Sequence, residues 1–130
     1  MKTENKKKRI LAIEDEPIIN LITVRVMRVA GFEVDVADNG ITAKAIVLNN
    51  TYHLYLCDIR TPAMNGLEFY QYLREMRPGH ENRIIFTTGD TLNLEIKTFL
   101  SSKNNLFLAK PFTPEELRTV IKTAHKTGRK

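Results

Sequence analysis

The sequence predicts an α/β protein with a doubly wound, five-stranded parallel sheet and helices on both faces. Two observations lead to this prediction. Five short apolar runs alternate with five segments whose apolar residues follow helical spacing, so that one strand and one helix recur about every 20 to 25 residues. Several of the runs are continuously apolar, as expected for strands that are covered on both faces. A chain of 130 residues then corresponds to one domain.

The five strands are expected where apolar or alternating runs are bounded by polar or turn-forming residues. The first and third runs are continuously apolar, whereas the second alternates between apolar and acidic residues. The five runs lie at 10–13, 32–36, 54–57, 83–86 and 106–108.

The helices are placed by apolar spacing and by start and stop signals. Pro17 suits the first turn of the first helix, and Gly31 suits its C-terminal cap. The second helix carries Ile41, Ala45 and Leu48 on one face. The helices are expected at about 17–30, 40–49, 67–76, 92–100 and 114–126.

Composition excludes several classes of protein. A single cysteine, Cys57, rules out an internal disulfide and a cysteine-based zinc cage, and its apolar neighbours predict a buried thiol. This cysteine usage favours a cytoplasmic location. No apolar run approaches the roughly 20 residues that span a bilayer, and the N-terminus lacks the core of a signal peptide, so we expect no membrane role.

The formal net charge of +5 comes from the two ends of the chain. Residues 1–9 carry five basic residues and one acidic residue, residues 122–130 carry four basic residues, and the part between them is mildly acidic. We therefore expect one domain between two basic tails, with limits at 1–8, 9–126 and 127–130. Since no basic patch is interleaved with aromatic residues, we expect no direct binding of nucleic acid.

Polar side chains follow four of the predicted strands at the point where each strand ends. Glu14 and Asp15 follow the first strand, Asp58 the third, Thr88 the fourth and Lys110 the fifth. Because the carboxyl ends of parallel strands meet at one edge of the sheet, these residues are expected to converge. Three carboxylates in one crevice would repel one another unless a cation lies between them, and oxygen ligands of this kind favour Mg²⁺.

Each of these residues also has an ordinary interpretation. The acids after the first strand would complement the dipole of the next helix, Asp58 would cap a helix or a turn, and Thr88 and Lys110 would be a loop threonine and a surface lysine. Their coincidence at four strand ends favours a site. A carboxylate nucleophile, a hydroxyl donor, an ammonium and a metal ion are what a protein needs to accept and hold a phosphoryl group.

Four motifs, Ile10–Pro17, Cys57–Gly66, Phe86–Asp90 and Lys110–Phe112, carry a family resemblance. Their order and spacing resemble the receiver domain of two-component response regulators, as in the single-domain chemotaxis regulator and in hybrid histidine kinases. The resemblance covers residues 9–126. It implies the flavodoxin-like (βα)5 fold and a place in a phosphorelay.

The resemblance also assigns roles by position. Asp58 would be the phosphoacceptor, taking a phosphoryl group from a phosphohistidine on a histidine kinase or a histidine phosphotransfer domain. Asp15 would bind Mg²⁺ directly and Glu14 through water, with Asp58 and the main-chain carbonyl of Arg60 completing the protein ligands.

Further roles concern the phosphoryl group and the signal. Thr88 would donate to one phosphoryl oxygen, and Lys110 would pair with another. The geometry of Lys110 would be set by a cis peptide bond between Lys110 and Pro111. Movement of Thr88 would let Phe107 turn inward and change the face formed by the fourth helix, the fifth strand and the fifth helix, which would bind a downstream protein. The alternative for Phe107 is a core or half-exposed strand residue.

The sequence departs from the family pattern at several positions. Glu14 stands where aspartate is commoner, which lengthens the acidic side chain. Thr61 replaces a usual methionine, and Ala63 stands where glycine is frequent. The resemblance implies that Arg60 and Asp90 flank the path of attacking water, where an Arg60–Asp90 pair would shield the acyl phosphate. The alternative is that they are two solvated loop charges.

Other functions remain as alternatives. A magnesium-dependent phosphohydrolase with an aspartyl nucleophile uses the same kinds of residue, although it normally carries the nucleophile after the first strand and has a cap. A pseudo-receiver that is not phosphorylated is a second alternative. No glycine-rich nucleotide motif follows the first strand. His53, His80 and His125 lack metal-ligand spacing and are expected at the surface.

The output of the domain is expected to lie elsewhere, because only residues 124–130 follow the core of the last helix. Either the chain is a stand-alone receiver, or it is part of a longer protein such as a hybrid histidine kinase. The loop at 86–90 resembles those of hybrid-kinase receivers and favours the second alternative. The sequence does not determine the oligomeric state, and a homodimer is one alternative.

Overall fold

The computed structural model describes residues 8–60, 64–90 and 92–126. Five parallel strands form one sheet in the order β2-β1-β3-β4-β5, which confirms the predicted fold class. Strand order reverses between β1 and β3, the place where parallel sheets of this type bind ligands. The strands are β1 (Lys8–Ile13), β2 (Phe32–Ala37), β3 (Leu54–Asp58), β4 (Ile84–Thr88) and β5 (Phe107–Ala109).

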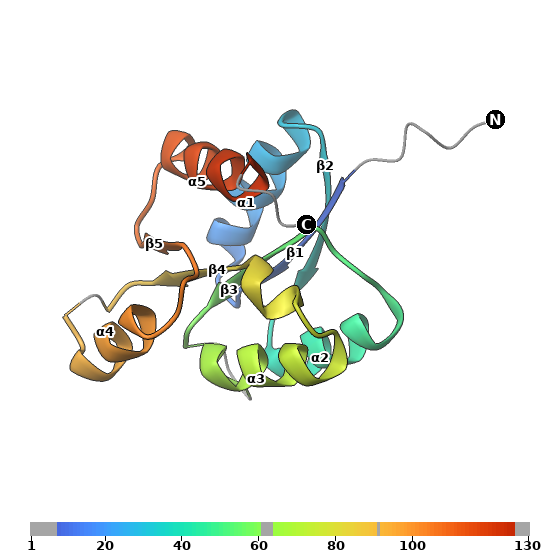
Figure 1. The fold of residues 1–130 in the computed structure, drawn as a ribbon. Helices are drawn as coiled ribbons and strands as arrows, with labels where there is room; N and C mark the ends of the chain where they lie inside the picture. The colour runs from blue at the N-terminus through green and yellow to red at the C-terminus, as the bar shows by residue number, and fades with distance from the viewer. Residues whose placement is uncertain (1–7, 61–63, 91, 127–130) are drawn as a thin grey trace.

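The helices form a layer on each side of the sheet (Figure 1). The first and last helices lie on one side and the other three on the opposite side. No helix within the described ranges is long and apolar enough to cross a membrane. The helices are α1 (Pro17–Val29), α2 (Gly40–Asn49), α3 (Gly66–Met76), α4 (Leu94–Ser101) and α5 (Pro114–Lys126), with a short 3-10 helix η1 (His80–Arg83) before β4.

The core consists of two apolar clusters, one on each side of the sheet. Leu11 and Phe86 belong to the cluster under α2, α3 and α4, whereas Ile10 and Ile85 belong to the cluster under α1 and α5. Neighbouring residues of one strand thus enter different clusters, because side chains alternate across a strand. Burial on both faces explains the continuously apolar runs, and the Cys57 thiol is buried as predicted.

The strands differ from the predicted ranges at their ends. β1 begins at Lys8, inside the segment expected as a tail, because backbone pairing with Phe32 of β2 does not depend on side-chain polarity. β4 begins one residue later than predicted, since Arg83 ends η1, and it continues to Thr88. β5 is shifted one residue toward the C-terminus.

Two helices begin at the predicted asparagines. The Asn39 side chain accepts a hydrogen bond from the Thr42 N–H at the start of α2. Asn65 and Glu68 form a reciprocal capping box at the start of α3. Gly31, predicted as a cap, has a φ of +98° just beyond α1, a conformation that favours glycine.

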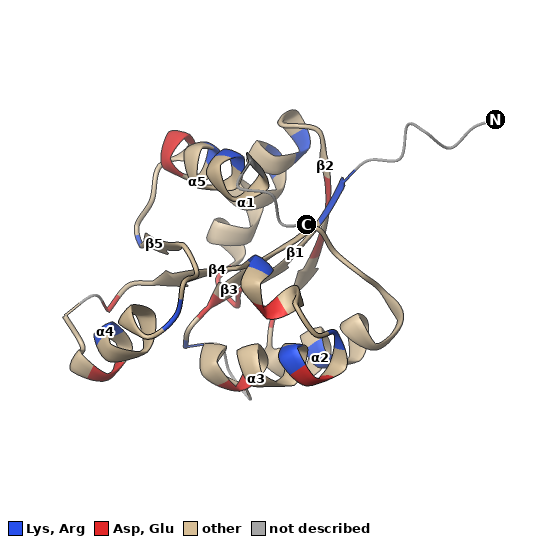
Figure 2. Cartoon of the chain, in the orientation of Figure 1, with Lys and Arg blue, Asp and Glu red and all other residues tan. Residues whose placement is uncertain are grey.

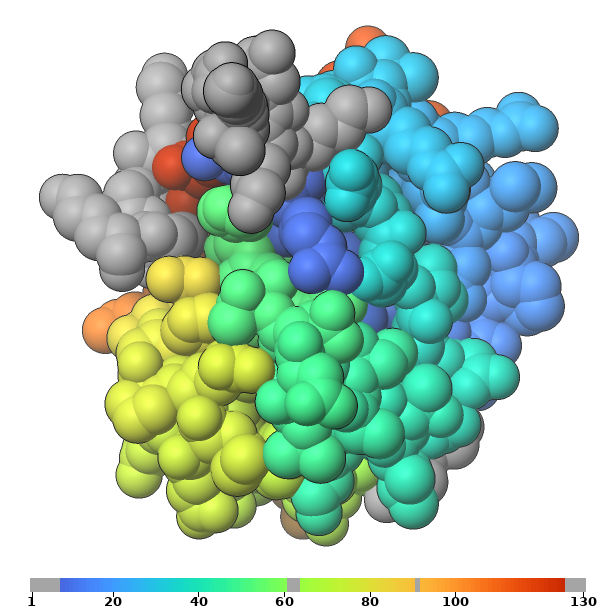
Figure 3. All heavy atoms as spheres, turned by 90° about the vertical axis from the view of Figure 1, so that its right-hand side faces the viewer, coloured from blue at the N-terminus to red at the C-terminus, as the bar shows by residue number. Residues whose placement is uncertain are grey.

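The apolar face predicted for α2 is not the face that packs into the core. Ile41, Ala45 and Leu48 are exposed, whereas Ala43 and Val47 pack into the core. Apolar residues surround much of this helix, so periodicity alone did not determine its orientation. Figure 3 turns the β2 edge toward the viewer, with α2 in cyan between α1 and the green to yellow segments.

α4 begins later than predicted. Asn93 caps it by accepting a hydrogen bond from the Ile96 N–H, so the first helical residue is Leu94. Leu92, which was assigned to the helix, precedes it and is 86% exposed. The predicted basic tails, apart from Lys8, and the departures at Thr61 and Ala63 lie outside the described residues.

Candidate functional site

The two central strands bring the predicted acidic residues together. Glu14 follows β1 directly, Asp58 is the last residue of β3, and both are buried, whereas Asp15 is exposed. One carboxylate oxygen from each of the three lies within 4.8 Å of the others. Figure 2 shows acidic residues in red at these strand ends. The sequence therefore placed the acidic cluster correctly.

Lys110, directly after β5, reaches into this cluster. Its Nζ atom lies 2.9 Å from Asp58 Oδ2, 2.9 Å from Glu14 Oε1 and 2.9 Å from Glu16 Oε1. An ammonium group has three N–H donors, so each carboxylate can accept one. The bond from Lys110 to Pro111 is cis, as the resemblance implies.

The cluster shifts the proton affinity of two of its members. Burial raises the pKa of Glu14 and the charge of Asp58 adds to this, while the hydrogen bond from Lys110 opposes it. Burial alone would lower the pKa of Lys110, but hydrogen bonds to Glu14, Asp58 and Glu16 outweigh it, so that the pKa lies above its usual value. Lys110 is therefore a cation at neutral pH.

The loop after β3 fixes the Asp58 carboxylate. Its Oδ1 atom accepts a hydrogen bond of 3.1 Å from the Arg60 N–H, while Oδ2 accepts from Lys110. The loop closes where the Gly66 N–H donates to the Ile59 carbonyl at 2.8 Å. A Cβ atom at Gly66 would lie 3.0 Å from the Ile59 backbone, so glycine permits this close approach.

Thr88 lies at the same edge of the sheet, at the end of β4. Its hydroxyl is buried and accepts a hydrogen bond of 3.0 Å from the Asp90 N–H. The Thr88 carbonyl accepts from the Lys110 N–H at 2.8 Å, which ties the end of β5 to β4. β4 is also paired with β3, with Thr87 opposite Asp58.

Arg60 and Asp90 form an ion pair of 2.7 Å between Nη2 and Oδ2. This is the paired arrangement of the two that the sequence left open. Both side chains are largely exposed, so the pair contributes about 0 to 1 kcal/mol to stability. Its shielding of an acyl phosphate stays a prediction.

Phe107 is 49% exposed, which agrees with a half-exposed strand residue rather than a core residue. It borders a groove of about 290 Å³ between α4 and β5. The other residues that line this groove are Ile96, Lys97, Leu100 and Ser101.

Sequence reasoning did not assign two residues that contact the cluster. Glu16 was treated only as one of several acids at a helix start, although its carboxylate binds Lys110. The Asn20 Nδ2 donates to the Glu14 carbonyl at 2.8 Å, and its Oδ1 is buried without a hydrogen-bond partner among the described residues. The acidic run at 14–16 was a usable signal for Glu16, whereas Asn20 carried none.

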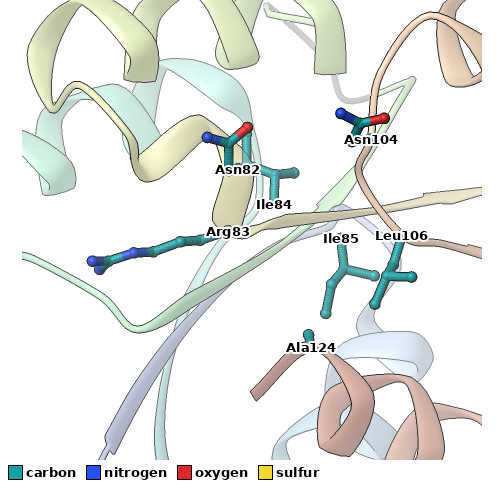
Figure 4. Close-up of a pocket in the computed structure, with 7 residues that line it drawn as sticks. All are labelled: Asn82, Arg83, Ile84, Ile85, Asn104, Leu106 and Ala124. Carbon is teal, nitrogen blue, oxygen red and sulfur yellow. The ribbon is translucent and has the colours of Figure 1, made fainter. Parts of the chain in front are cut away.

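The opposite end of the sheet holds a cavity of about 140 Å³ (Figure 4). The amides of Asn82 and Asn104 lie above Ile85, Leu106 and Ala124. Its lining contains no carboxylate, so this cavity has no counterpart of the acidic cluster. The full lining is Asn82, Arg83, Ile84, Ile85, Asn104, Leu106 and Ala124.

Two of the three histidines, His53 and His125, lie at the surface as expected, whereas His80 does not. His80 is half-buried, and its Nδ1 atom lies 2.9 Å from the Tyr55 hydroxyl oxygen. His53 is exposed, but its Nδ1 accepts a hydrogen bond from the Arg9 N–H. His125 is exposed and packs edge-on against Phe32. Side-chain partners from other segments explain the difference for His80.

Comparison with known proteins gives relatives of one kind. The chain is 31% identical over 123 residues to hybrid signal transduction histidine kinase K of Dictyostelium discoideum, covering 89% of this chain and 10% of the relative. The first curated relatives are longer proteins, of which the chain spans 10% to 52%.

Solved structures of similar proteins share the fold. The receiver domain of sensor histidine kinase PA1611 from Pseudomonas aeruginosa PAO1, which has a magnesium ion in its active site cleft, matches with a TM-score of 0.79 and 26% identity over 91% of this chain and 97% of its own. Response regulator TrrA from Thermotoga maritima, in complex with Mg²⁺-BeF, matches with a TM-score of 0.76 and 30% identity over 90% of this chain and 98% of its own.

The profile of the response regulator receiver domain matches residues 10–122, which include every member of the acidic cluster and Lys110. The motifs, the parallel sheet and the gathered carboxylates agree with that match. The chain therefore belongs to the response regulator receiver domain family of two-component signalling.

Proposed function

We propose that Asp58 accepts a phosphoryl group from a phosphohistidine on a histidine kinase or a histidine phosphotransfer domain. One observation carries the proposal: the Lys110 ammonium lies 2.9 Å from the Asp58 carboxylate inside a cluster of acids. The hybrid kinases among the relatives support a partner of this kind. A cytoplasmic location, where such partners would meet it, is part of the proposal.

The donor set fits Mg²⁺. Glu14, Asp15 and Asp58 offer carboxylate oxygens within 4.8 Å of one another, and hard oxygen ligands are those that this ion prefers. Asp15 and Asp58 would bind the ion directly, Glu14 through water, and Arg60 through its main-chain carbonyl. When bound, Mg²⁺ would neutralise negative charge on the phosphoryl oxygens. The two magnesium-containing neighbours support this assignment.

The transfer uses the carboxylate as the nucleophile. An Asp58 oxygen forms a bond to phosphorus, the bond from phosphorus to the histidine nitrogen breaks, and its electron pair stays on the imidazole. Lys110 would then donate to a phosphoryl oxygen. Thr88 would turn its hydroxyl toward a second phosphoryl oxygen and stabilise the same charge.

The proposed output depends on Phe107. A shift of Thr88 toward the phosphoryl group would leave space beside β5, and an apolar ring gains about 25 cal/mol per Å² withdrawn from water. The face of α4, β5 and α5 would then change for a downstream protein partner or a second copy. Coupling of this kind amounts to a few kcal/mol at most, so phosphorylation would shift a population.

A direct test of the output uses beryllofluoride with magnesium as a phosphate mimic. Amide signals of residues 92–110 and of α5 should change more than those of α2. Phe107→Ala should still be phosphorylated on Asp58 and lose most of the distal change. Unchanged distal shifts in that variant would assign the ring to packing alone.

The two alternatives predict different reaction products. A phosphohydrolase would release phosphate with many turnovers, and a pseudo-receiver would never be labelled. The family assignment favours a receiver over a phosphohydrolase. As a receiver, the chain would hold one phosphoryl group and lose it by slow autodephosphorylation.

The test of the proposed function is labelling by a small phosphodonor with magnesium. The parent should carry one acid-stable, alkali-labile phosphate, and Asp58→Asn should carry none. Asp38→Asn, a change of an exposed aspartate outside the cluster, is the matched control and should label like the parent. Equal labelling of Asp58→Asn would place the acceptor elsewhere.

A further inference from the structure

Glu16 makes a contact that its local position does not explain. It is the N-cap residue of α1, yet its side chain makes no capping hydrogen bond. Instead Oε1 lies 2.9 Å from the Nζ atom of Lys110, 94 residues away. The Glu16 side chain is 59% exposed, so its charge lies at the mouth of the cluster.

The donors of Lys110 make Glu16 a competitor for the incoming group. The ammonium has three N–H donors and three carboxylate partners at 2.9 Å. A phosphoryl oxygen can therefore gain a donor only if one partner gives way. Glu14 is buried, and its other oxygen already accepts from the Glu16 N–H, whereas the Glu16 carboxylate can exchange Lys110 for water at low cost.

The charge of Glu16 acts on the donor before any bond forms. Another carboxylate beside Lys110 reduces the attraction of the site for anions, and more so for a donor with two negative charges than for a donor with one. If the Glu16 carboxylate and the donor charge are about 7 Å apart in a water-like dielectric, each unit of donor charge changes the rate of Asp58 phosphorylation about twofold to threefold at low salt.

We propose that Glu16 is a positioning residue that holds the Lys110 ammonium in the free protein and disfavours phosphorylation of Asp58 by highly anionic small phosphodonors. This inference rests on the proposed function and names a selectivity of the same site. Donors whose phosphoryl group sits on a nitrogen that can carry a proton, as in phosphoramidate or phosphohistidine, are disfavoured less.

Two probes differ in charge but deliver the same group. With acetyl phosphate, an Asp58 oxygen bonds to phosphorus, the bond between phosphorus and the acetyl oxygen breaks, and acetate leaves with the electron pair. With phosphoramidate in its nitrogen-protonated form, the bond between phosphorus and nitrogen breaks, ammonia leaves with the electron pair, and it takes up a proton from water afterwards to give ammonium. At neutral pH, acetyl phosphate carries about two negative charges and phosphoramidate a net charge of about one.

The experiment compares rates of Asp58 phosphorylation with both donors at saturating magnesium. Glu16→Gln removes the charge but keeps an acceptor for Lys110, and Glu16→Ala removes both. Glu33→Gln is the control, because it removes an equal charge from an exposed residue of β2 that faces Arg9 in the register. Thermal unfolding is measured for every variant.

For Glu16→Gln at low salt, we expect the acetyl phosphate rate to rise about fivefold and the phosphoramidate rate about twofold, so that their ratio rises about twofold to threefold. The change in ratio should vanish near 1 M salt, where the screening length falls to about 3 Å. Glu16→Ala should show the same change in the ratio of the acetyl phosphate rate to the phosphoramidate rate. Both of its rates should be lower than those of Glu16→Gln, because Lys110 loses a hydrogen-bond partner.

The outcomes separate the two proposals. If the parent labels but the ratio in Glu16→Gln equals that of the parent or of Glu33→Gln, Glu16 is only a surface ion-pair partner and this inference is wrong. A ratio that changes equally at low and high salt also contradicts it. If the parent labels with neither donor, the proposed function itself fails, and the selectivity fails with it.

Discussion

Polar groups at the two ends of the sheet are balanced differently. Near the amino-terminal ends of β1 and β3, Arg9 and Tyr52 both donate to Asp35 of β2, at 2.8 Å and 2.6 Å, so one acid has two donors. At the carboxyl ends, four carboxylates gather near the single ammonium of Lys110.

The difference separates structural from functional polarity. A buried polar group whose hydrogen bonds are complete stabilises the fold, whereas a cluster with excess charge of one sign lowers stability unless a ligand completes it. Toward the amino-terminal ends Asp35 has two donors, whereas at the carboxyl ends Glu14, Glu16 and Asp58 share the one ammonium of Lys110. Substitutions at the two ends should therefore change the free energy of unfolding and the magnesium affinity by different amounts or with opposite sign.

The largest expected effect follows loss of the shared cation. Lys110→Met should lower the free energy of unfolding by about 2 to 3 kcal/mol without metal, because Glu14 and Asp58 lose their counter-charge. Arg9→Met at the other end should cost less than about 1 kcal/mol, since its ion pair with Asp35 is half exposed. Urea unfolding measures both, and equal losses would contradict the contrast.

Metal affinity should depend on one end only. Asp15→Asn should weaken magnesium binding about tenfold or more, because it removes a charged oxygen ligand from the cluster. Asp35→Asn should leave the affinity unchanged. Metal titration followed by fluorescence or calorimetry gives both values, and an Asp15→Asn affinity equal to that of the parent would show that the metal site is assigned wrongly.

The sign of the stability change should differ between the ends. Tyr52→Phe should destabilise the protein by about 1 kcal/mol, because the ring is buried and its hydroxyl donates to Asp35. Asp58→Asn should stabilise the metal-free protein by up to about 1 kcal/mol, since it removes one of several mutually repelling charges. Denaturant midpoints compare them, and a stabilising Tyr52→Phe would break the comparison.

The smallest effect concerns His80 and pH. Burial lowers its pKa from the ordinary value of 6.5, and the charges of Arg83 and Arg77 lower it further. The folded protein thus favours the neutral imidazole, so the contribution of His80 to stability is present above pH 6.5 and is lost as the pH falls through its lowered pKa. His80→Gln should reduce the fall in the free energy of unfolding as the pH drops below 6.5. The change in free energy should be smaller than that caused by Tyr52→Phe. An unchanged slope would assign the acid sensitivity to other groups.

Much of the site was predictable because strand ends can be located from local patterns. Glu14, Asp15, Asp58, Thr88 and Lys110 each follow a run of apolar residues, and parallel topology alone brings such positions to one edge. What could not be predicted was which side chains pair within that edge. The contact between Glu16 and Lys110 joins residues 94 positions apart, and its geometry depends on the packed ends of β1 and β5.

The sequence by itself determined the five strand and helix units, the helix starts at Asn39 and Asn65, and the set of residues at the acidic edge. These features depend on short-range periodicity, capping and strand order. Only the tertiary structure decided that α2 buries Ala43 and Val47 rather than its Ile41 face, that His80 lies beside Tyr55, and that three carboxylates share Lys110. The reason is physical: each of these choices depends on distances between segments that lie far apart in the chain, and those distances exist only once the two faces of the sheet are packed.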